Sequence, residues 1–206
     1  MSIKLYNFDT SGHAHRIRLM LSFLELEYDC HDVNLGAGEH KSDAFLAMNP
    51  FGHVPVLEDD GVTIYDSTAI LVYLAKKYDT TGKWLPANPL KAAQVQQWLS
   101  AASGEIAFGP AAARLVTVFG ADRDHEKAKA LAHAFFKPLN AILADREFLT
   151  GSEITIADVA GYSYIAHAPE GDVDLEPYAN IRAWLGRIEN QPGFVPMTST
   201  PVALVA

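Results

Sequence analysis

The sequence is poor in cysteine, in positive charge and in long apolar runs. Its single cysteine, Cys30, excludes an internal disulfide and a CxxC redox centre, which fits a reducing compartment. There are 16 Lys and Arg residues against 25 Asp and Glu, and the net charge of −9 argues against binding to nucleic acid or to an anionic membrane surface. No charge-free apolar run is long enough to span a bilayer, and the N-terminus lacks the apolar core of a signal peptide. These shortages predict a soluble cytoplasmic protein.

The first 79 residues show strand and helix patterns in the order βαβαββα. The predicted strands cover 3–8, 27–35, 54–58 and 62–64, and the predicted helices cover 13–26, 41–48 and 68–78. Asp60-Gly61 between the last two strands is a strong hairpin signal. Cys30 falls in the middle of the second strand, where a small core residue is expected rather than a nucleophile. The pattern predicts an α+β domain in which helices cover a small mixed sheet.

No strand pattern survives beyond residue 79. The segment 80–89 contains one glycine and two prolines without clear periodicity, and it is predicted to be a linker. An Ala-rich helical stretch over 90–119 should be bent or interrupted at Gly104, Gly109 and Pro110. Further helices are predicted at 123–146, 156–167 and 177–189, the second opened by a capping box at Thr155–Asp158 and the third by a favourable proline. The predicted division is a first domain over 1–79, a linker over 80–89 and an all-helical domain over 90–206.

The stretch from Asn49 to Ser67 organises the first domain. Pro55 has no N–H, and after Gly-His-Val it predicts a tight turn of the kind that admits a cis peptide bond. Such a turn leaves the N–H and C=O of Val54 unpaired and available to a peptide laid alongside as an extra strand. Asp66 and Ser67 then open a helix whose first N–H groups suit a carboxylate. The segment therefore predicts a site for a short acidic peptide.

This stretch resembles the glutathione-binding half of the glutathione transferases. The family pattern is Asn-Pro-Phe-Gly-x-Val-Pro-x-Leu and then acidic-Ser-x-Ala-Ile-x-x-Tyr-Leu, which matches Asn49–Leu57 and Asp66–Leu74 closely. The resemblance extends over nearly the whole chain and is weakest over 92–148. It implies a thioredoxin-like first domain, an all-α second domain, glutathione as co-substrate without a metal, and a homodimer. Phe51 is then a candidate for the aromatic side chain that some classes insert into the neighbouring subunit.

Ser11 is the candidate catalytic residue. It lies between the first strand and the first helix, where a hydroxyl can donate a hydrogen bond to a bound thiolate and lower the thiol pKa from ~8.5. A hydrogen bond to an ion is worth roughly 1.5–3 kcal/mol and a helix terminus about 0.3–1 kcal/mol, enough for a shift of about two pKa units. Taken alone, Ser11 could equally be a helix cap. The run from Ser11 to Arg16 resembles the catalytic-serine segment of the phi-type transferases, with Tyr6 and Thr10 as alternative hydroxyls.

The resemblance also implies the other glutathione contacts. They are His40 and Lys41 at the glycine carboxylate, His53 in place of a usual Gln, Val54 and Pro55 at the peptide backbone, and Asp66 and Ser67 at the γ-glutamyl group. Without the motif, His40 and Lys41 would be interpreted as a solvated charge run. Asp66 is one methylene shorter than the more usual Glu. Arg16 is expected to support the loop, and His13 and His15 have no metal-ligand partners at credible spacing.

The second substrate is expected in the helical half. The candidates are Phe108, Ala111, Ala112 and Leu115, with Phe119 and Arg114 on the same stretch, although this spacing fits ordinary core packing equally well. The tail over 194–206 could cover the cleft or pack down. The predicted activity is conjugation of glutathione to small hydrophobic electrophiles. A glutathione-dependent peroxidase, isomerase or dehalogenase and a non-catalytic binding or stress protein are the alternatives.

Overall fold

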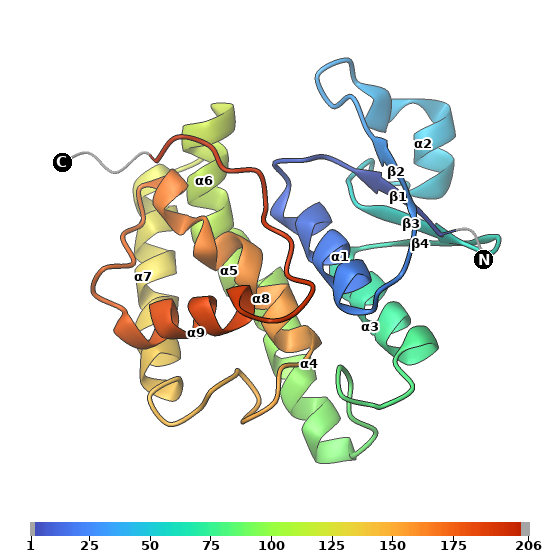
Figure 1. Cartoon of the computed structure of the whole chain (residues 1–206). Coiled ribbons are helices and arrows are strands. Elements are labelled where there is room, and N and C mark those ends of the chain that lie inside the picture. The colour runs from blue at the N-terminus through green and yellow to red at the C-terminus, as the bar shows by residue number, and fades with distance from the viewer. Residues whose placement is uncertain (1–2, 203–206) are drawn as a thin grey trace.

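A four-stranded mixed sheet lies at one end of the molecule (Figure 1). The structure, a computed structural model, describes residues 3–202. The strands are β1 (Ile3–Asn7), β2 (Asp29–Asp32), β3 (Val56–Asp59) and β4 (Val62–Tyr65), in the order β2-β1-β3-β4. β1 runs parallel to β2 and antiparallel to β3, which pairs antiparallel with β4.

Helices cover both faces of this sheet. The larger core, which includes Leu5 and Leu57, faces α1 (Gly12–Phe23) and α3 (Ser67–Tyr78), while α2 (Asp43–Met48) contributes Phe45 to a smaller cluster that contains Val33 and Val56. The short 3-10 helix η1 (Glu39–Lys41) precedes α2. Successive strand side chains point to opposite faces, so Leu5 lies in the larger core and its neighbour Tyr6 packs on the smaller cluster. The predicted βαβαββα order and thioredoxin-like α+β fold are confirmed.

The β3–β4 hairpin takes its shape from local signals in the sequence. Asp60 and Gly61 have φ of 48° and 84°, as the two-residue Asp-Gly turn requires. Pro55 lies just before β3, outside the strand ladder as expected, and its bond to Val54 is cis.

The second half of the chain is helical. Its elements are α4 (Pro89–Ser103), α5 (Glu105–Phe108), α6 (Pro110–Phe119), α7 (His125–Ile142), α8 (Ile156–Ala166), η2 (Ala168–Gly171) and α9 (Ala179–Glu189). As expected, the first helical stretch is interrupted at Gly104 and Gly109. A Cβ on Gly109 would lie 2.7 Å from the Glu105 carbonyl oxygen and 3.0 Å from backbone atoms of Ala132, so glycine is required where the helices meet. Between 80 and 202 the described strand pairing is one isolated bridge between Phe148 and Gly151.

Several predicted ends and one predicted environment are wrong. α9 begins at Ala179 rather than at Pro177, and α2 begins at Asp43 because the Ser42 side chain caps it by accepting from the Phe45 N–H. α7 is shorter than 123–146. Cys30 is exposed rather than buried, because β2 is an edge strand of the sheet. Its pKa is raised by partial burial and by Asp32, so the thiol is not activated.

α8 joins the two halves. The predicted capping box forms at the start of α8. The Thr155 side chain accepts from the backbone of Asp158, and the Asp158 side chain accepts from the backbone N–H of Thr155. At the other end of this helix, Ser163 and Tyr164 pack on α1: Ser163 bonds His15, and a Cβ on Gly12 would lie 2.8 Å from the Tyr164 ring.

The C-terminal tail packs down alongside α1 (Figure 1). His15 Nε2 donates to the Val195 carbonyl at 2.8 Å, the Ser22 hydroxyl donates to the Gly193 carbonyl at 2.6 Å, and Met197 is buried. Residues 203–206 of the predicted tail lie outside the described part. Among the described helices, none has both the length and the apolar character needed to cross a membrane.

Candidate functional site

The loop between β1 and α1 is held by hydrogen bonds along its backbone. Four consecutive carbonyl oxygens, from Phe8 to Ser11, each accept one. In order, the donors are the Ser11 N–H at 2.8 Å, Arg18 Nη2 at 3.2 Å, Arg114 Nη1 at 2.8 Å and the His15 N–H at 2.9 Å. This loop therefore has a defined conformation at the point where it presents Ser11.

Ser11 is the N-cap of α1. Its hydroxyl oxygen accepts a hydrogen bond from the Ala14 N–H at 3.3 Å, and its side chain is half-buried. A hydroxyl has one proton to donate in addition to its acceptor lone pairs. The capping role and the donation of a hydrogen bond to a ligand are therefore compatible in the same side chain.

His13 connects the starts of α1 and α3. Its Nδ1 lies 3.2 Å from the Ser67 hydroxyl and 2.9 Å from Arg16 Nη1. Burial and the adjacent Arg16 guanidinium lower the His13 pKa to about 3. The imidazole is therefore neutral at physiological pH, and Nδ1 is assigned as the acceptor of both hydrogen bonds. Although Ser11 and Ser67 are far apart in sequence, this contact brings their helix termini together.

Arg16 places a buried positive charge beneath the start of α3. Its side chain is fully buried and donates from Nη1 to the Ser67 hydroxyl at 3.2 Å, while Nε and Nη2 have no partner among residues 3–202. Burial lowers the Arg16 pKa to about 10, so the guanidinium stays charged at neutral pH. A buried cation without a bonded carboxylate, beside the positive end of the α3 dipole, favours an anion at Ser67.

Asp66 caps α3 with one carboxylate oxygen. Its Oδ1 accepts from the N–H groups of Thr68 and Ala69 at 2.9 and 3.0 Å and from the Thr68 hydroxyl at 2.5 Å. Burial acts to raise the Asp66 pKa, but these hydrogen bonds outweigh it and the pKa is lowered. Oδ2 takes part in none of the hydrogen bonds of the described residues, so the ionised carboxylate retains an acceptor for an ammonium group.

Lys41 and His40 lie against the turn that precedes Pro55. Lys41 Nζ donates to the carbonyls of Phe51 and Gly52, both at 3.2 Å. Gly52 has φ of 61°, and a Cβ there would lie 2.6 Å from the His40 carbonyl oxygen, so only glycine fits this approach. Lys41 thus braces the turn, and its ammonium group has a third N–H for a ligand.

The backbone of Val54 is free in the described chain: neither its N–H nor its C=O takes part in any of the hydrogen bonds found within 3–202. The neighbouring His53 is exposed, and its carbonyl accepts from Asn49 Nδ2 at 2.8 Å. Burial, then Lys41, then His53 lower the pKa of His40, and His53 also acts to lower that of His13. His53 therefore lies next to Val54, within electrostatic reach of His40 and of His13.

The structure does not bring Tyr6 to this group. Its hydroxyl donates to Glu58 at 2.9 Å, and its ring packs edge-on against Phe45 on the α2 face of the sheet. Thr10 contributes its carbonyl oxygen to the contact with Arg114. Of the three hydroxyls considered from the sequence, that of Ser11 caps α1, two residues before His13.

The predicted electrophile residues divide between a hollow and the core. Phe108 is 60% exposed, Leu115 is half-buried, and Ala111 and Ala112 are buried. Phe108 and Ala112 line a hollow of about 590 Å³ between α5, α6 and α7, whose other lining residues are Gly104, Glu105, Arg123, Asp124, Lys127, Ala128 and Leu131. Ala111 and Leu115 are not part of its lining. Phe119 packs instead against Phe8, with ring centroids 6.2 Å apart.

His13 and Glu170 were not found from the sequence as parts of the site region, and Arg114 was noted only for its position. The signal for His13 was its place two residues after Ser11 and three before Arg16. Glu170 has no local signal, because its partner Arg114 lies 56 residues away. No group of three or more His, Cys, Asp or Glu side chains within 3–202 is arranged to hold a metal ion.

Known proteins resemble the chain along most of its length. Residues 1–76 match the family model described as "Glutathione S-transferase, N-terminal domain", and residues 106–192 match "Glutathione S-transferase, C-terminal domain". Glutathione S-transferase 3 of Zea mays is 32% identical, over 93% of this chain and 91% of its own.

Solved structures of glutathione transferases also resemble the chain. A glutathione S-transferase from Pseudomonas fluorescens Pf-5 has a TM-score of 0.88 at 33% identity, covering 95% of this chain and 98% of its own. A glutathione transferase homolog from Drosophila mojavensis with bound glutathione has a TM-score of 0.84 at 30% identity, covering 93% and 89%. The chain belongs to the glutathione S-transferase family, and the expected enzyme class, a glutathione transferase, is confirmed.

Proposed function

We propose that this protein ionises glutathione with the help of the Ser11 hydroxyl and transfers the thiolate to small hydrophobic electrophiles. The observation that supports this best is the hydrogen bond between His13 and Ser67. It joins the start of α1, where Ser11 is the cap, to the start of α3, where a buried arginine and the helix dipole favour an anion. The proposed thiolate site and the proposed carboxylate site are thereby adjacent.

In the proposed complex, the cysteinyl backbone of glutathione pairs with the free N–H and C=O of Val54, next to Pro55. The γ-glutamyl carboxylate binds at Ser67 over Arg16, and Oδ2 of Asp66 accepts from the γ-glutamyl ammonium. At the other end, His40, Lys41 and His53 face the glycine carboxylate. Every polar end of the peptide then meets a group of opposite charge or matching hydrogen-bond character.

The chemical step follows from the position of the hydroxyl. Ser11 accepts a hydrogen bond from the Ala14 N–H and donates one from its hydroxyl to the thiolate sulfur. This lowers the thiol pKa and raises the ionised fraction, and the thiol proton is released to solvent. The sulfur then forms a bond to the electrophilic carbon as the leaving group departs or the double bond accepts the electron pair. We place the electrophile on the helical half, where Phe108 and Ala112 line the hollow described above. Ala111 and Leu115 stay candidates from the sequence.

We also propose that residues 1–79 bind glutathione, that 80–89 connect the halves, and that 90–206 supply the electrophile pocket. A cytoplasmic location stays a prediction from the sequence.

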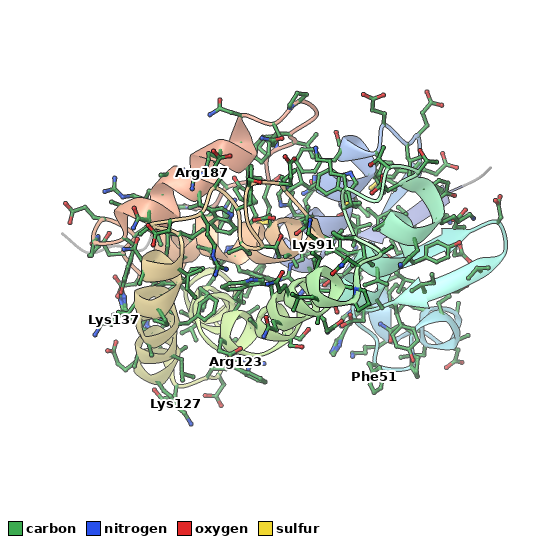
Figure 2. All side chains as sticks on the ribbon, turned by 90° about the horizontal axis from the view of Figure 1, so that it is seen from below. Phe51, Lys91, Arg123, Lys127, Lys137 and Arg187 are labelled. Atoms are coloured by element: carbon green, nitrogen blue, oxygen red, sulfur yellow. The ribbon has the colours of Figure 1, made fainter. Side chains whose placement is uncertain are left out.

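A homodimer is proposed from the exposed surface. Phe51 is 64% exposed and packs edge-on with Tyr65 at 6.0 Å. Figure 2 shows Phe51 from the first half, and Arg123 and Lys127 from the second, projecting toward the same edge of the view. These two cations have no ion-pair partner within the described chain, so they are available to carboxylates of a second acidic copy. Phe51→Ser should shift the mass measured by light scattering from dimer to monomer.

The proposed function is tested by binding and by turnover together. The wild type should be retained on immobilised glutathione, and free glutathione should raise its melting temperature. Ser11→Ala should keep this retention but lose turnover with an aromatic halide electrophile by about 10²-fold. Ser103→Ala, at the exposed end of α4, is the matched control and should match the wild type. Equal turnover in Ser11→Ala and wild type would move the role to another hydroxyl.

A panel of substrates separates the alternatives. Hydroperoxides, isomerisable unsaturated carbonyls and haloalkanes would be tested beside conjugation substrates, because all four reactions share the glutathione contacts. Conjugation with the largest kcat/KM supports the proposal. A preference for another class would keep the site and change the reaction, and no turnover with a normal thiol pKa would indicate a binding protein.

A further inference from the structure

Arg114 links the helical half of the molecule to the loop that carries Ser11. It lies in α6 with 2% of its side chain exposed, and its Nη1 donates to the Thr10 carbonyl at 2.8 Å. The other three consecutive carbonyls of this loop are bonded by donors from residues 11, 15 and 18. Of these four carbonyls, that of Thr10 is thus the one whose hydrogen-bond donor comes from the distant half of the chain.

Glu170 fixes the other side of the same guanidinium. Arg114 Nε donates to Glu170 Oε2 at 2.5 Å, and His167 Nδ1 lies 2.6 Å from Oε1. Glu170 as a whole is 4% exposed. Burial acts to raise the Glu170 pKa, but its hydrogen bonds outweigh this and lower the pKa to about 2. The buried cation therefore faces a carboxylate that is ionised throughout the working pH range.

The C-terminal tail completes this junction. The Thr200 N–H donates to Glu170 Oε1 at 3.0 Å, and the Thr200 hydroxyl donates to Oε2 at 2.5 Å. The tail reaches this point after running alongside α1 (Figure 1). A continuous chain of hydrogen bonds therefore runs from the tail through Glu170 and Arg114 to Thr10, the residue before Ser11.

The junction has little freedom to adjust. A Cβ on Gly171 would lie 2.6 Å from the Arg114 backbone nitrogen, so η2 and α6 are in backbone contact there. The Thr117 hydroxyl also donates to the Glu170 carbonyl oxygen at 2.6 Å. A guanidinium can donate in two directions from one rigid plane, whereas a lysine ammonium at the end of a flexible stem cannot reproduce both contacts.

We propose that Arg114 is a positioning residue for the thiolate site, and that the C-terminal tail acts on the orientation of Ser11 through Thr200, Glu170 and Arg114. This rests on the proposed role of Ser11. Arg114 touches neither glutathione nor the reacting sulfur in this account. It holds the Thr10 carbonyl, and through it the peptide that sets the direction of the Ser11 hydroxyl.

The test measures the pKa of the bound thiol in addition to the stability of the protein. Arg114→Lys keeps a positive charge beside Glu170 but gives up the two-directional contact. Thr200→Val removes one hydrogen bond at the tail end and leaves the loop untouched, and Thr198→Val, an exposed threonine of the same tail, is its matched control. For each variant, we would measure the apparent pKa of bound glutathione by thiolate absorbance, the pH profile of kcat, the Kd of S-methylglutathione and the melting temperature.

Arg114→Lys should raise the thiol pKa by about one unit, which lowers turnover near neutral pH by up to about tenfold and restores most of it at higher pH. Thr200→Val should shift the profile in the same direction by less, and Thr198→Val should not shift it. The Kd of S-methylglutathione should stay within about twofold, because it has no thiol to ionise.

The inference is overturned if both variants lower only the melting temperature or reduce kcat equally at every pH. Should Arg114→Lys fail to fold, Thr200→Val and Thr198→Val decide the matter alone. If the wild type does not ionise glutathione, the proposed function fails and this inference with it. If Ser11→Ala raises the thiol pKa while these variants do not, the proposed function stands and only the positioning role of Arg114 is lost.

Discussion

His15 should make the protein sensitive to mild acid. Its ring is fully buried between α1, α8 and the tail, with Nδ1 2.8 Å from the Ser163 hydroxyl and Nε2 2.8 Å from the Val195 carbonyl. Because a carbonyl can only accept, Nε2 carries the proton and Nδ1 accepts from Ser163. Burial, and to a smaller extent the guanidinium charges of Arg18 and Arg16, lower the His15 pKa to about 4. The neutral form is therefore the one that the fold stabilises.

The sign and size of the effect follow from linkage. The unfolded chain takes up a proton as pH falls through about 6.5, whereas folded His15 does so only near its lowered pKa, so this contribution to stability is present above pH 6.5 and is lost as pH falls toward 4. At about pH 5 the loss is on the order of 2 kcal/mol. His13, whose pKa is lowered to about 3, should add a loss of similar sign.

Urea unfolding between about pH 7.5 and 5 measures this loss. His15→Gln keeps a donor for Val195 and an acceptor for Ser163 but cannot titrate, so its free energy of unfolding should fall by about 2 kcal/mol less than that of the wild type over this range. Ser163→Ala is the control: it should lower stability at every pH yet retain the acid-dependent loss. Parallel curves for the wild type and His15→Gln would refute the reasoning.

Three further predictions concern the site. Lys41→Ala should raise the Kd of glutathione by about tenfold in calorimetry with little change in kcat, because its contact is the same in ground and transition states; a selective loss of kcat would contradict this. In the proposed complex, protonation of His40 adds a positive charge beside the glycine carboxylate, so the affinity for S-methylglutathione should rise as pH falls below the usual imidazole range, and His40→Gln should reduce that rise. Gly12→Ala should cost about 1–3 kcal/mol in urea unfolding through its clash with the Tyr164 ring, and the cost should shrink in a Tyr164→Leu background; additive effects would count against it.

The parts of the fold that sequence reasoning found are those with local signals. Asp60-Gly61 specifies its hairpin, Ser67 follows a capping Asp66, and Pro55 keeps Val54 out of the strand ladder, all within a few residues of one another. Cys30 shows the limit. Its strand was recognised, but whether a strand is central or at an edge depends on pairing with distant segments, so its exposure could not be predicted.

The candidate site, like the fold, could be predicted from the sequence only where its signals are local. Ser11, Asp66 and Ser67 were predicted from cap chemistry and from resemblance. The hydrogen bond from His13 to Ser67 crosses 54 residues, and that from Arg114 to Thr10 crosses 104. Hydrophobic periodicity in the sequence does not predict such contacts, because they depend on how the two halves of the chain pack. An arginine in an acidic chain can be singled out from the sequence as a candidate, but the residue that it bonds cannot be inferred from sequence spacing.

The central claim is that the protein holds glutathione as a thiolate with the help of Ser11. Thiolate absorbance of glutathione in the presence of saturating protein, recorded across pH, measures this directly. We expect an apparent thiol pKa about two units below the ~8.5 of a free thiol, and a value in Ser11→Ala that returns most of the way toward it. An unshifted thiol pKa in the wild type, or the same lowered value in Ser11→Ala, would contradict it.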